Sequence, residues 1–472
     1  MDRVGAPPPH RPTELPVRAL QRTRLLALAA VVAALLSCTA NRPGTGGAAA
    51  PAVPVFDGAG CGSVDTGWGF QAGVTHTEHS IGTGADLGAP PAAPEALAGA
   101  RRLLQSVGPL QNMHIFGFGE LKPPRAPAGG PFDWTAMDAR MRLICSTGGT
   151  PVITLCCSPS WATDHYDPAA PNDDTHLYQA PLPSHYQDYA DMAVAIAQHY
   201  PFVQYFQVWN EFKGFYGVPG PGGTTDYSRW DYQGYTAFYN TVFRALDGYR
   251  RGARRTLRIG GPYIPTPTWY DPAAAGHPAT DPALRGQPWG TLDQRPLDAF
   301  TYWLDHKAGA DFLIVDGGTD TEPDCPPGQP DCPADQKYRH FPSPADGDAK
   351  LRAVNAWLWA RMTDPSHPDR RVLPIWWSEL YAPVDGSNAG TTDAYRSALA
   401  ALAGSGASVA LMWGPEYQPN TAGSCHQASG HLECTDGFPA LWTRPTPTGG
   451  GEPPPGPDYL TVMQEFAGPH SP

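Results

Sequence analysis

Short apolar stretches alternate along the chain with amphipathic stretches of helical length. The apolar stretches are continuous and do not alternate apolar with polar residues, which is typical of parallel strands buried on both faces. They predict eight strands, at residues 69–75, 112–119, 151–157, 203–209, 257–261, 312–315, 372–377 and 408–413. The amphipathic stretches predict helices at residues 94–106, 134–146, 186–200, 232–249, 297–307, 349–362 and 395–403. Within the second of these helices, Met137, Met141 and Ile144 recur at helical spacing.

Eight strands separated by helix-length segments are the signature of a (β/α)8 barrel, an α/β fold in which helices surround a ring of parallel strands. We therefore predict a single TIM barrel at residues 59–472, with an irregular extension after residue 417. An open doubly wound sheet is the alternative, but no G-x-G-x-x-G turn follows the first strand. The chain contains 52 Gly and 55 Pro, so the loops of the barrel are expected to be long and stiff.

The composition narrows the class of protein further. Hydrophobic residues make up 41% of the chain and aromatic residues 11%, which is too much apolar material for intrinsic disorder. Acidic residues outnumber basic ones by 45 to 32, and the formal net charge of -13 repels phosphate backbones. Nucleic acid is therefore not expected as a partner.

The N-terminal region has the pattern of an export signal. Five arginines stand among the first 24 residues, and an uncharged run of 12 residues follows at 25–36. A membrane-spanning helix needs about 20 apolar residues, so residues 1–37 are predicted to be a signal peptide. The run ends in Leu35-Leu36-Ser37-Cys38, which resembles a bacterial lipobox and implies a membrane-attaching lipid on Cys38. The alternative is an ordinary signal peptide cleaved near Ala40.

With either signal, the protein is expected to be exported as a cell-envelope lipoprotein or an extracellular protein. Residues 38–58 are predicted to form a flexible tether, because residues 39–54 are mostly Gly, Ala and Pro and have few large side chains to bury. We expect the exported chain to be a monomer.

Eight cysteines remain besides Cys38, an even number that an oxidising compartment allows to pair. Two pairs are close enough in sequence to close single loops, Cys325 with Cys332 and Cys425 with Cys434. The pairing of Cys61, Cys145, Cys156 and Cys157 stays open. Adjacent strand residues face opposite ways, so only one of Cys156 and Cys157 is expected to reach Cys145 readily. No C-x-x-C pair is present, and no metal site is predicted.

Two glutamates stand at predicted strand ends. Glu211 follows strand four in the stretch QVWNEF, and Glu379 follows strand seven in WWSEL. In a barrel of this type the loops after the strands converge on one face, so these carboxyl groups are expected to meet there. Apolar neighbours raise the pKa of a carboxyl group toward values useful for proton donation. Glycosidic bond cleavage needs such a pair, whereas a lone strand-end glutamate would more simply cap a loop or pair with an arginine.

The residues Trp209-Asn210-Glu211 and Ser378-Glu379 resemble the retaining glycoside hydrolases of clan A in both order and strand placement. The stretches FDWTAMDARM, FQVWNEF and GYTAFYNTVFRAL are most similar to glycoside hydrolase family 39, the β-xylosidase-like group, and the resemblance of the barrel covers residues 64–417. The resemblance implies an O-glycosyl hydrolase without a cofactor. In it, Glu211 is the acid/base, Asn210 holds the sugar 2-hydroxyl and Glu379 is the nucleophile.

The chain departs from family 39 in two respects. It has no obvious room for the added β-sandwich of that family. Its sixth strand ends in Val315-Asp316-Gly317-Gly318, where the family usually has a histidine near an aromatic residue. The identity of the sugar and the setting of the nucleophile are therefore left open by the resemblance.

Further residues near predicted strand ends are candidates for binding substrate: Trp161, Trp209, Trp377, Trp413, Tyr263 and His76. Flat rings suit the apolar faces of pyranoses, but aromatic side chains also dominate cores, so core packing is the alternative for each tryptophan. The resemblance favours Trp413, because clan A enzymes often place a tryptophan at the end of strand eight. Tyr263, after strand five, is expected to contact the sugar or the nucleophile.

The sequence thus predicts a retaining glycosidase of oligo- or polysaccharides, with a slight preference for neutral glycans because the acidic chain repels acidic ones. Two alternatives stay open. One is a metal-dependent hydrolase that uses His76 and His79, although no third ligand is evident and the H-E-x-x-H pattern is absent. The other is a non-catalytic, carbohydrate-binding barrel lipoprotein.

Overall fold

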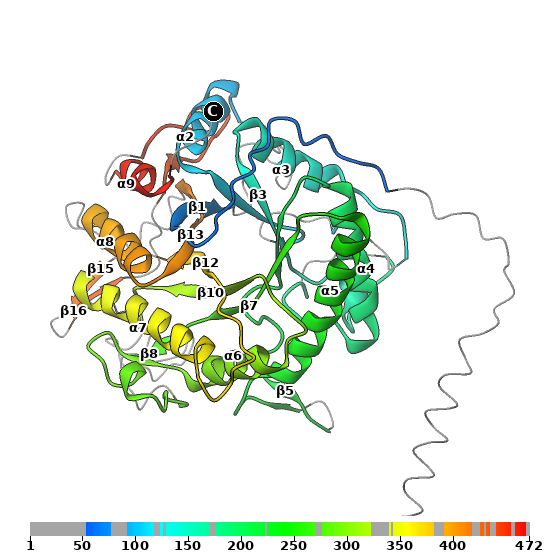
Figure 1. Ribbon diagram of the computed structural model, residues 1–472. Coiled ribbons are helices and arrows are strands. Elements are labelled where there is room, and N and C mark those ends of the chain that lie inside the picture. The colour runs from blue at the N-terminus through cyan, green and yellow to red at the C-terminus, as the bar shows by residue number, and fades with distance from the viewer. Residues whose placement is uncertain are drawn as a thin grey trace, which may run out of the picture. The chain divides into compact units, whose positions relative to one another are not determined.

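Eight parallel strands close into a barrel in the computed structural model of the protein (Figure 1). The structure describes residues 53–76, 92–117, 123–125, 129–169, 176–221, 224–269, 276–321, 339–340, 343–381, 391–417, 425–428, 431–434, 440–454 and 458–468. Around the ring, the strands follow the order β1-β13-β12-β10-β7-β4-β3-β2, so each pairs with its neighbours in the chain and β13 closes onto β1. The predicted (β/α)8 fold is confirmed.

The barrel strands are β1 (Gln71–Thr75), β2 (Leu110–His114), β3 (Thr150–Leu155), β4 (Tyr205–Val208), β7 (Arg258–Pro265), β10 (Phe312–Gly318), β12 (Ile375–Tyr381) and β13 (Ala407–Trp413). The helices between them are α2 (Pro94–Val107), α3 (Thr135–Ser146), α4 (Tyr186–His199), α5 (Tyr232–Ala253), α6 (Gln294–His306), α7 (Pro344–Met362) and α8 (Thr391–Gly404). One helix stands between each pair of consecutive barrel strands, and the helices lie around the ring of strands (Figure 1).

The strands are buried on both faces, as their continuous apolar runs predict. One apolar cluster contains barrel residues such as Leu110, Val152 and Trp376, and a larger cluster joins the other strand face to the helices. Every residue of β2, β3 and β4 is buried.

Three strands run further than predicted. β7 extends to Pro265, four residues beyond its predicted end at residue 261, and β10 and β12 also extend. The predicted strands end at residues 315 and 377, whereas β10 extends to Gly318 and β12 to Tyr381. Backbone pairing continues through the polar residues, and Asp316 on β10 stands opposite Glu379 on β12. Glu379 therefore lies within a strand, not in the loop beyond it, and the ladder of backbone hydrogen bonds fixes its backbone position.

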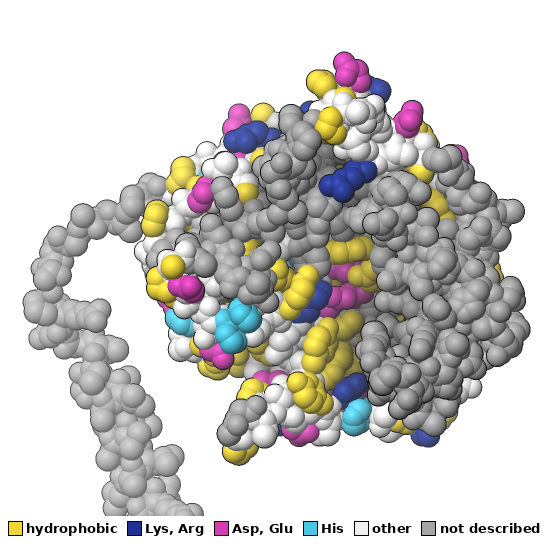
Figure 2. Space-filling model, turned by 180° about the vertical axis from the view of Figure 1, so that it is seen from behind, with side chains coloured by type: hydrophobic (Ala, Val, Ile, Leu, Met, Phe, Trp, Pro, Cys, Tyr) yellow, Lys and Arg dark blue, Asp and Glu magenta, His cyan; other side chains and the backbone are white. Residues whose placement is uncertain are grey.

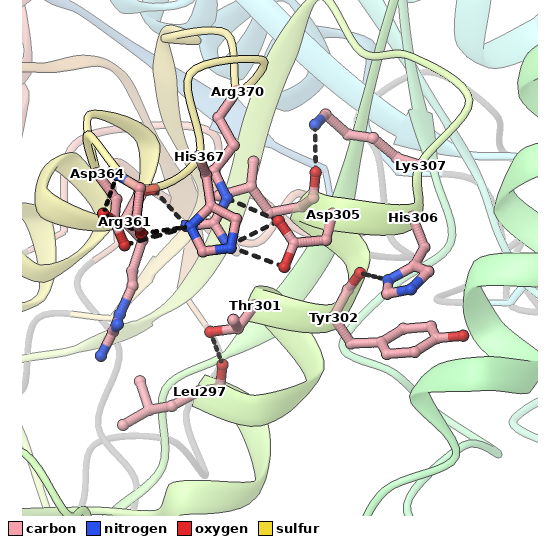
Figure 3. A network of polar contacts seen from close by, with 12 residues as sticks. Leu297, Thr301, Tyr302, Asp305, His306, Lys307, Arg361, Asp364, His367 and Arg370 are labelled. Carbon is pink, nitrogen blue, oxygen red and sulfur yellow. Dashed lines mark hydrogen bonds and ion pairs between the residues drawn. The ribbon is translucent and has the colours of Figure 1, made fainter.

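The segment that leads into β12 is tied to α6 by an ion pair (Figure 3). The Nε and Nη2 atoms of Arg370 donate to the two carboxylate oxygens of Asp305 at 2.7 and 2.8 Å. His367 and Arg370 also approach Asp364, at 3.4 and 3.9 Å. A bidentate pair of this kind fixes direction as well as distance, so the start of the strand that carries Glu379 is held from outside the barrel.

The N-terminal boundary lies earlier than predicted. The backbone N–H of Phe56 donates to the carbonyl of His199 at 2.8 Å, and the ring of Phe56 lies 5.5 Å from that of Tyr200. The predicted tether at residues 38–58 is therefore wrong at its C-terminal end, because Pro54 and Phe56 contact His199 at the end of α4. The predicted signal peptide, with Cys38, lies outside the described residues.

The extension after the barrel was predicted to be irregular, but part of it forms regular secondary structure. It includes β17 (Trp442–Thr443), which pairs with β14 (Glu416–Tyr417) just before the extension, and the helix α9 (Tyr459–Phe466). The chain beyond α9 contacts the barrel, since Gln71 Nε2 donates to the carbonyl of Ala467 at 3.0 Å. An apolar face drives this docking, with Val462 and Met463 of α9 buried. Among the described residues, no helix combines the length and the apolar character that crossing a membrane requires.

The disulfides differ from the expectation for Cys145. Cys61 bonds to Cys145, and Cys156 bonds to its neighbour Cys157, so neither of the adjacent cysteines reaches Cys145. The N-terminal segment brings Cys61 there, since the N–H of Gly62 donates to the carbonyl of Gly149 just after α3.

Of the two predicted loop disulfides, Cys325 and Cys332 lie outside the described residues. Cys425 and Cys434 stand opposite each other in the antiparallel pair of β15 (Cys425–Ala428) and β16 (His431–Cys434), for which the structure describes the backbone. The Cys425 to Cys434 bond stays a prediction, and the register of the two strands is compatible with it.

Candidate active site

Three carboxyl groups converge at the carboxyl ends of the barrel strands. Glu211 follows β4, Asp316 is on β10 and Glu379 is on β12, and one oxygen from each lies within 4.8 Å of the other two. Asp316 and Glu379 are each 1% exposed, whereas the Glu211 side chain is 20% exposed. Glu211 and Asp316 line a cavity of about 220 Å³ together with Tyr381 and Trp413. Figure 2 shows acidic side chains in a hollow of the face turned away from the viewer in Figure 1.

Glu379 accepts hydrogen bonds on both of its carboxylate oxygens. Asn210 Nδ2 and the Tyr263 hydroxyl donate to Oε1 at 2.6 and 2.8 Å, and the Tyr381 hydroxyl donates to Oε2. Burial and the charge of Glu211 raise the pKa of Glu379 to about 7, while Lys213 and the two tyrosines oppose that rise. The hydrogen bonds favour and orient the ionised form, which is the form that attacks carbon.

A tight turn places Glu211 at the end of β4. Trp209, Glu211 and Phe212 all have positive φ angles, of 73°, 47° and 57°. Non-glycine residues adopt this region at a cost of roughly 1–3 kcal/mol each, so the surrounding contacts must hold the turn. The Lys213 ammonium supplies two of these contacts, to the Glu211 carboxylate and to Asn210 Oδ1, the latter at 2.6 Å.

Lys213 is the cation of this cluster. Burial alone would lower the pKa of Lys213, but the charges of Glu211, Glu379 and Asp316 raise it above the usual value, so the ammonium group stays charged. Three carboxylates could also supply the oxygen ligands that hard metal ions take. In this structure, an ammonium group already provides positive charge next to Glu211.

The structure brings three of the predicted substrate-binding residues to the carboxyl groups. Asn210 and Tyr263 contact Glu379 directly. Trp413 lines the cavity, with its ring 6.3 Å from that of Tyr381 and 6.2 Å from that of His114. These residues come from β4, β7 and β13, which are distant in sequence.

The other three tryptophans are buried in the core, each with its indole N–H bonded elsewhere. Trp161 donates to the carbonyl of Arg125 at 2.6 Å, Trp209 to that of Lys213 at 2.8 Å, and Trp377 to Asn355 Oδ1 at 2.9 Å. All three are at most 2% exposed. The structure therefore does not bring them into the described cavity, and it places them in the core packing that was the alternative for each.

His76 also lies away from the carboxyl groups. Its Nε2 is 3.1 Å from Gln111 Oε1, and the amide nitrogen of Gln111 donates to Thr147. Burial lowers the pKa of His76 to about 4, so the imidazole is neutral near pH 7. The partner that the metal-hydrolase alternative requires, His79, lies outside the described residues.

Sequence reasoning missed Asp316, Lys213 and Tyr381 as site residues. Tyr381 stands two positions after Glu379 in β12, and this spacing was a usable signal because such strand residues share a face. Lys213 stands two positions after Glu211 but lies in the turn after β4, where strand alternation gives no signal. In the sequence, Asp316 was noted only because it stands near the position where family 39 usually has a histidine. The glycine that follows it permits a close approach of β10 to β7, since a Cβ on Gly317 would meet Thr266 Oγ1 at 2.2 Å.

The chain was compared with known proteins. No protein-family model and no curated protein sequence matches it. Among solved structures, it is similar to a monomeric β-xylosidase from Caulobacter crescentus CB15, with 14% identity, 87% of this chain and 70% of that chain covered, and a TM-score of 0.48. It is also similar to a β-glucosidase from Exiguobacterium marinum, with 13% identity, 85% of this chain and 99% of that chain covered, and a TM-score of 0.46. A β-glycosidase from Pyrococcus horikoshii is 13% identical, with 84% of this chain and 93% of that chain covered and a TM-score of 0.43. Likenesses of this size carry no inference about activity, which rests on the site itself.

The Tyr263 hydroxyl predicts a pH effect. Its hydrogen bond favours ionised Glu379, so Tyr263→Phe should raise the pKa of that carboxyl group further above its usual value. In the nucleophile role that the resemblance to clan A implies, Glu379 must be ionised, so the rising, acidic limb of kcat/KM should move to higher pH by about one unit. Such a bond contributes about 1.5–3 kcal/mol, and one pKa unit corresponds to about 1.4 kcal/mol.

The matched control is Tyr235→Phe. Tyr235 is also fully buried, but its hydroxyl donates to the carbonyl of Val208 and not to Glu379. This change should lower thermal stability and leave the acidic limb in place. An acidic limb that is unmoved in Tyr263→Phe would contradict the role given to its hydroxyl.

Proposed function

We propose that the protein is a retaining glycoside hydrolase, in which Glu379 is the nucleophile and Glu211 is the acid/base. One observation carries this proposal: an oxygen of Glu211, which lines the cavity, lies within 4.8 Å of an oxygen of the buried Glu379. Retaining glycosidases hold their two carboxyl groups about 5–5.5 Å apart, whereas inverting enzymes leave roughly 6.5–9.5 Å for a water molecule.

In the first step, a lone pair of a Glu379 oxygen forms a bond to the anomeric carbon while the bond to the leaving oxygen breaks. Glu211 donates its proton to that oxygen, so the aglycone departs as a neutral alcohol. Glu211 suits this role because its side chain is the more exposed of the two and lines the cavity. Glu379 suits the role of the nucleophile, because three side chains donate hydrogen bonds to its two carboxylate oxygens and fix their positions.

In the second step, Glu211 removes a proton from water, and the water oxygen bonds to the anomeric carbon. The bond to Glu379 breaks and returns the carboxylate. Two inversions at carbon give a product with the configuration of the substrate. The loss of the negative charge on Glu379 in the intermediate lowers the proton affinity of Glu211 for the interval between the steps.

The cavity favours one class of substrate. The carboxyl groups of Asp316 and Glu211 lie on its wall, and Asp320 and Lys350 line it as well, so three acids face one lysine. A uronic acid would meet like charge at short range, which destabilises binding. Trp413 offers an aromatic face for the apolar side of a sugar ring. We therefore assign the site to a neutral glycan, and xylose is the sugar that the resemblance to family 39 implies.

The test is the stereochemistry of hydrolysis. Proton NMR of the first-formed product from an aryl β-glycoside, recorded before mutarotation, should show the β-anomer. A panel of β-xyloside and β-glucoside substrates selects the one that is turned over fastest. An α-anomer would contradict double displacement, and binding of sugars without hydrolysis of any member of the panel would favour a non-catalytic binding protein.

A further inference from the structure

The double displacement uses two carboxyl groups, and the site holds a third. Asp316 is 1% exposed, and its Oδ2 has no hydrogen-bond partner among the residues that the structure describes. One of its oxygens lies within 4.8 Å of oxygens of both Glu211 and Glu379. A buried, ionised carboxylate is costly unless it is paired, so this group must share a proton or a cation with its neighbours.

The charged and titratable groups that face Asp316 come from three elements. The turn after β4 carries Glu211 and Lys213, β12 carries Glu379 and Tyr381, and β7 carries Tyr263. Burial and the charge of Glu379 raise the pKa of both tyrosines well above its usual value, so both stay neutral.

His114, on β2, approaches Glu379 at 4.0 Å and is neutral as well, because burial and the charge of Lys213 hold its pKa well below the usual value. Among the described residues, the cluster therefore holds three acids, Asp316 included, and the Lys213 ammonium. Asp320 and Lys350 line the same cavity and add one charge of each sign. With every acid ionised, the buried site would carry an excess of two negative charges.

A single proton on the acids removes half of that excess. Lys213 contacts Glu211 and pairs with its charge. Burial, followed by the charges of Glu211 and Glu379, raises the pKa of Asp316 well above its usual value. Neighbouring carboxyl groups that interact this strongly titrate as a pair.

We propose that Asp316 and Glu211 share a single proton, and that Asp316 acts as a positioning residue that keeps Glu211 protonated at neutral pH and strengthens it as a base. This inference rests on the proposed function. Lys213 acts on Glu211 in the opposite direction, because a neighbouring cation favours the ionised form.

The protons balance over the reaction. Before the first step, the pair of Glu211 and Asp316 carries one proton, which passes from Glu211 to the leaving oxygen as the bond from Glu379 to carbon forms. The pair is then doubly ionised next to Lys213. In the second step the pair regains one proton from water, whose oxygen replaces Glu379 at carbon. The repulsion between the two carboxylates favours this uptake.

The test compares pH profiles of kcat/KM for the wild type, Asp316→Asn and Lys213→Gln, with a substrate whose leaving group needs protonation. The alkaline limb reports the loss of the proton of the acid. It should move to lower pH by about one unit or more in Asp316→Asn, so that kcat/KM falls about tenfold at the alkaline end. It should move to higher pH in Lys213→Gln, which keeps the inference testable if Asp316→Asn does not fold. If the alkaline limb moves in neither Asp316→Asn nor Lys213→Gln, the proposal is overturned.

The matched control is Asp311→Asn, the same change immediately before β10, at the opposite end of that strand from Asp316. Asp311 pairs with Arg250 at 2.5 Å. Its substitution should lower stability without moving the alkaline limb. A limb that moves as far in this control as in Asp316→Asn would show a general effect on the barrel and would also overturn the proposal.

A titration that needs no turnover separates this inference from the proposed function. In protein labelled with 13C at glutamate carboxyl groups, the Glu211 signal is the one lost in Glu211→Gln. Its titration midpoint should be lower in Asp316→Asn than in the wild type. If no glycoside is hydrolysed but the midpoint shifts, only the proposed function fails. If glycosides are hydrolysed but the midpoint stays, only the proton sharing fails.

Discussion

Glu379→Ala should reduce kcat on aryl β-glycosides by roughly 10⁴-fold or more, because the variant cannot form the covalent intermediate. The replacement leaves a space at the point where Asn210, Tyr263 and Tyr381 now donate to the carboxylate. An added azide ion can occupy that space and attack the anomeric carbon from the same side. Azide should therefore restore turnover and give a glycosyl azide of inverted configuration.

The control for this prediction is Glu379→Gln. Glutamine fills nearly the same volume as glutamate, so it should be as inactive as the alanine variant but should not respond to azide. Circular dichroism and thermal unfolding establish that both variants keep the barrel. A folded Glu379→Ala variant that azide does not rescue, or one that keeps its activity, would contradict Glu379 as the nucleophile.

Glu211→Ala should discriminate between leaving groups. A glycoside with a poorly acidic leaving group needs the proton, so its kcat/KM should fall by roughly 10²- to 10⁴-fold. A 2,4-dinitrophenyl glycoside needs almost no protonation, so its kcat/KM should stay within about tenfold of the wild type. The alkaline limb of the pH profile should disappear, because the group whose ionisation it reports is gone.

Azide distinguishes this variant from Glu379→Ala by stereochemistry. Here Glu379 still forms the glycosyl intermediate, and azide replaces water in the second step, so the glycosyl azide should have retained configuration. The control is Lys213→Gln, which leaves Glu211 in place and should keep its dependence on the leaving group close to that of the wild type. Equal losses for good and poor leaving groups in Glu211→Ala would contradict the acid/base role.

The barrel was predictable because its signals are local. Continuous apolar runs set the strands, and amphipathic stretches such as residues 134–146, which contain α3, set the helices between them. The positions of Glu211 and Glu379 follow from the same pattern, since a residue next to an apolar strand terminus in a parallel barrel faces the loops of one end. The polar ends of β10 and β12 were missed, because backbone pairing continues there without apolar side chains.

Local pattern could not decide which aromatic residues reach the site. Trp209 and Trp377 each stand two positions before one of the glutamates, yet both are fully buried in the core. Strand residues two positions apart normally share a face, so alternation alone would direct Trp377 and Glu379 the same way. The pairing of β12 with β10 skips Ser378, and Trp209 has a positive φ angle, so neither stretch is a regular strand there. Trp413 reaches the cavity because β13 ends beside β1 and β12.

The sequence by itself determined the order of strands and helices, the barrel they form and the two glutamates at strand ends, because each of these follows from periodicity over a few residues. The tertiary structure alone decided that Asp316 meets Glu211 and Glu379, that Lys213 is their cation, that Cys61 pairs with Cys145, and that the tyrosines of β7 and β12 hold the Glu379 carboxylate. These contacts join residues up to 169 positions apart, as from Asn210 to Glu379. They depend on closure of the barrel, which sets distances that no local pattern encodes.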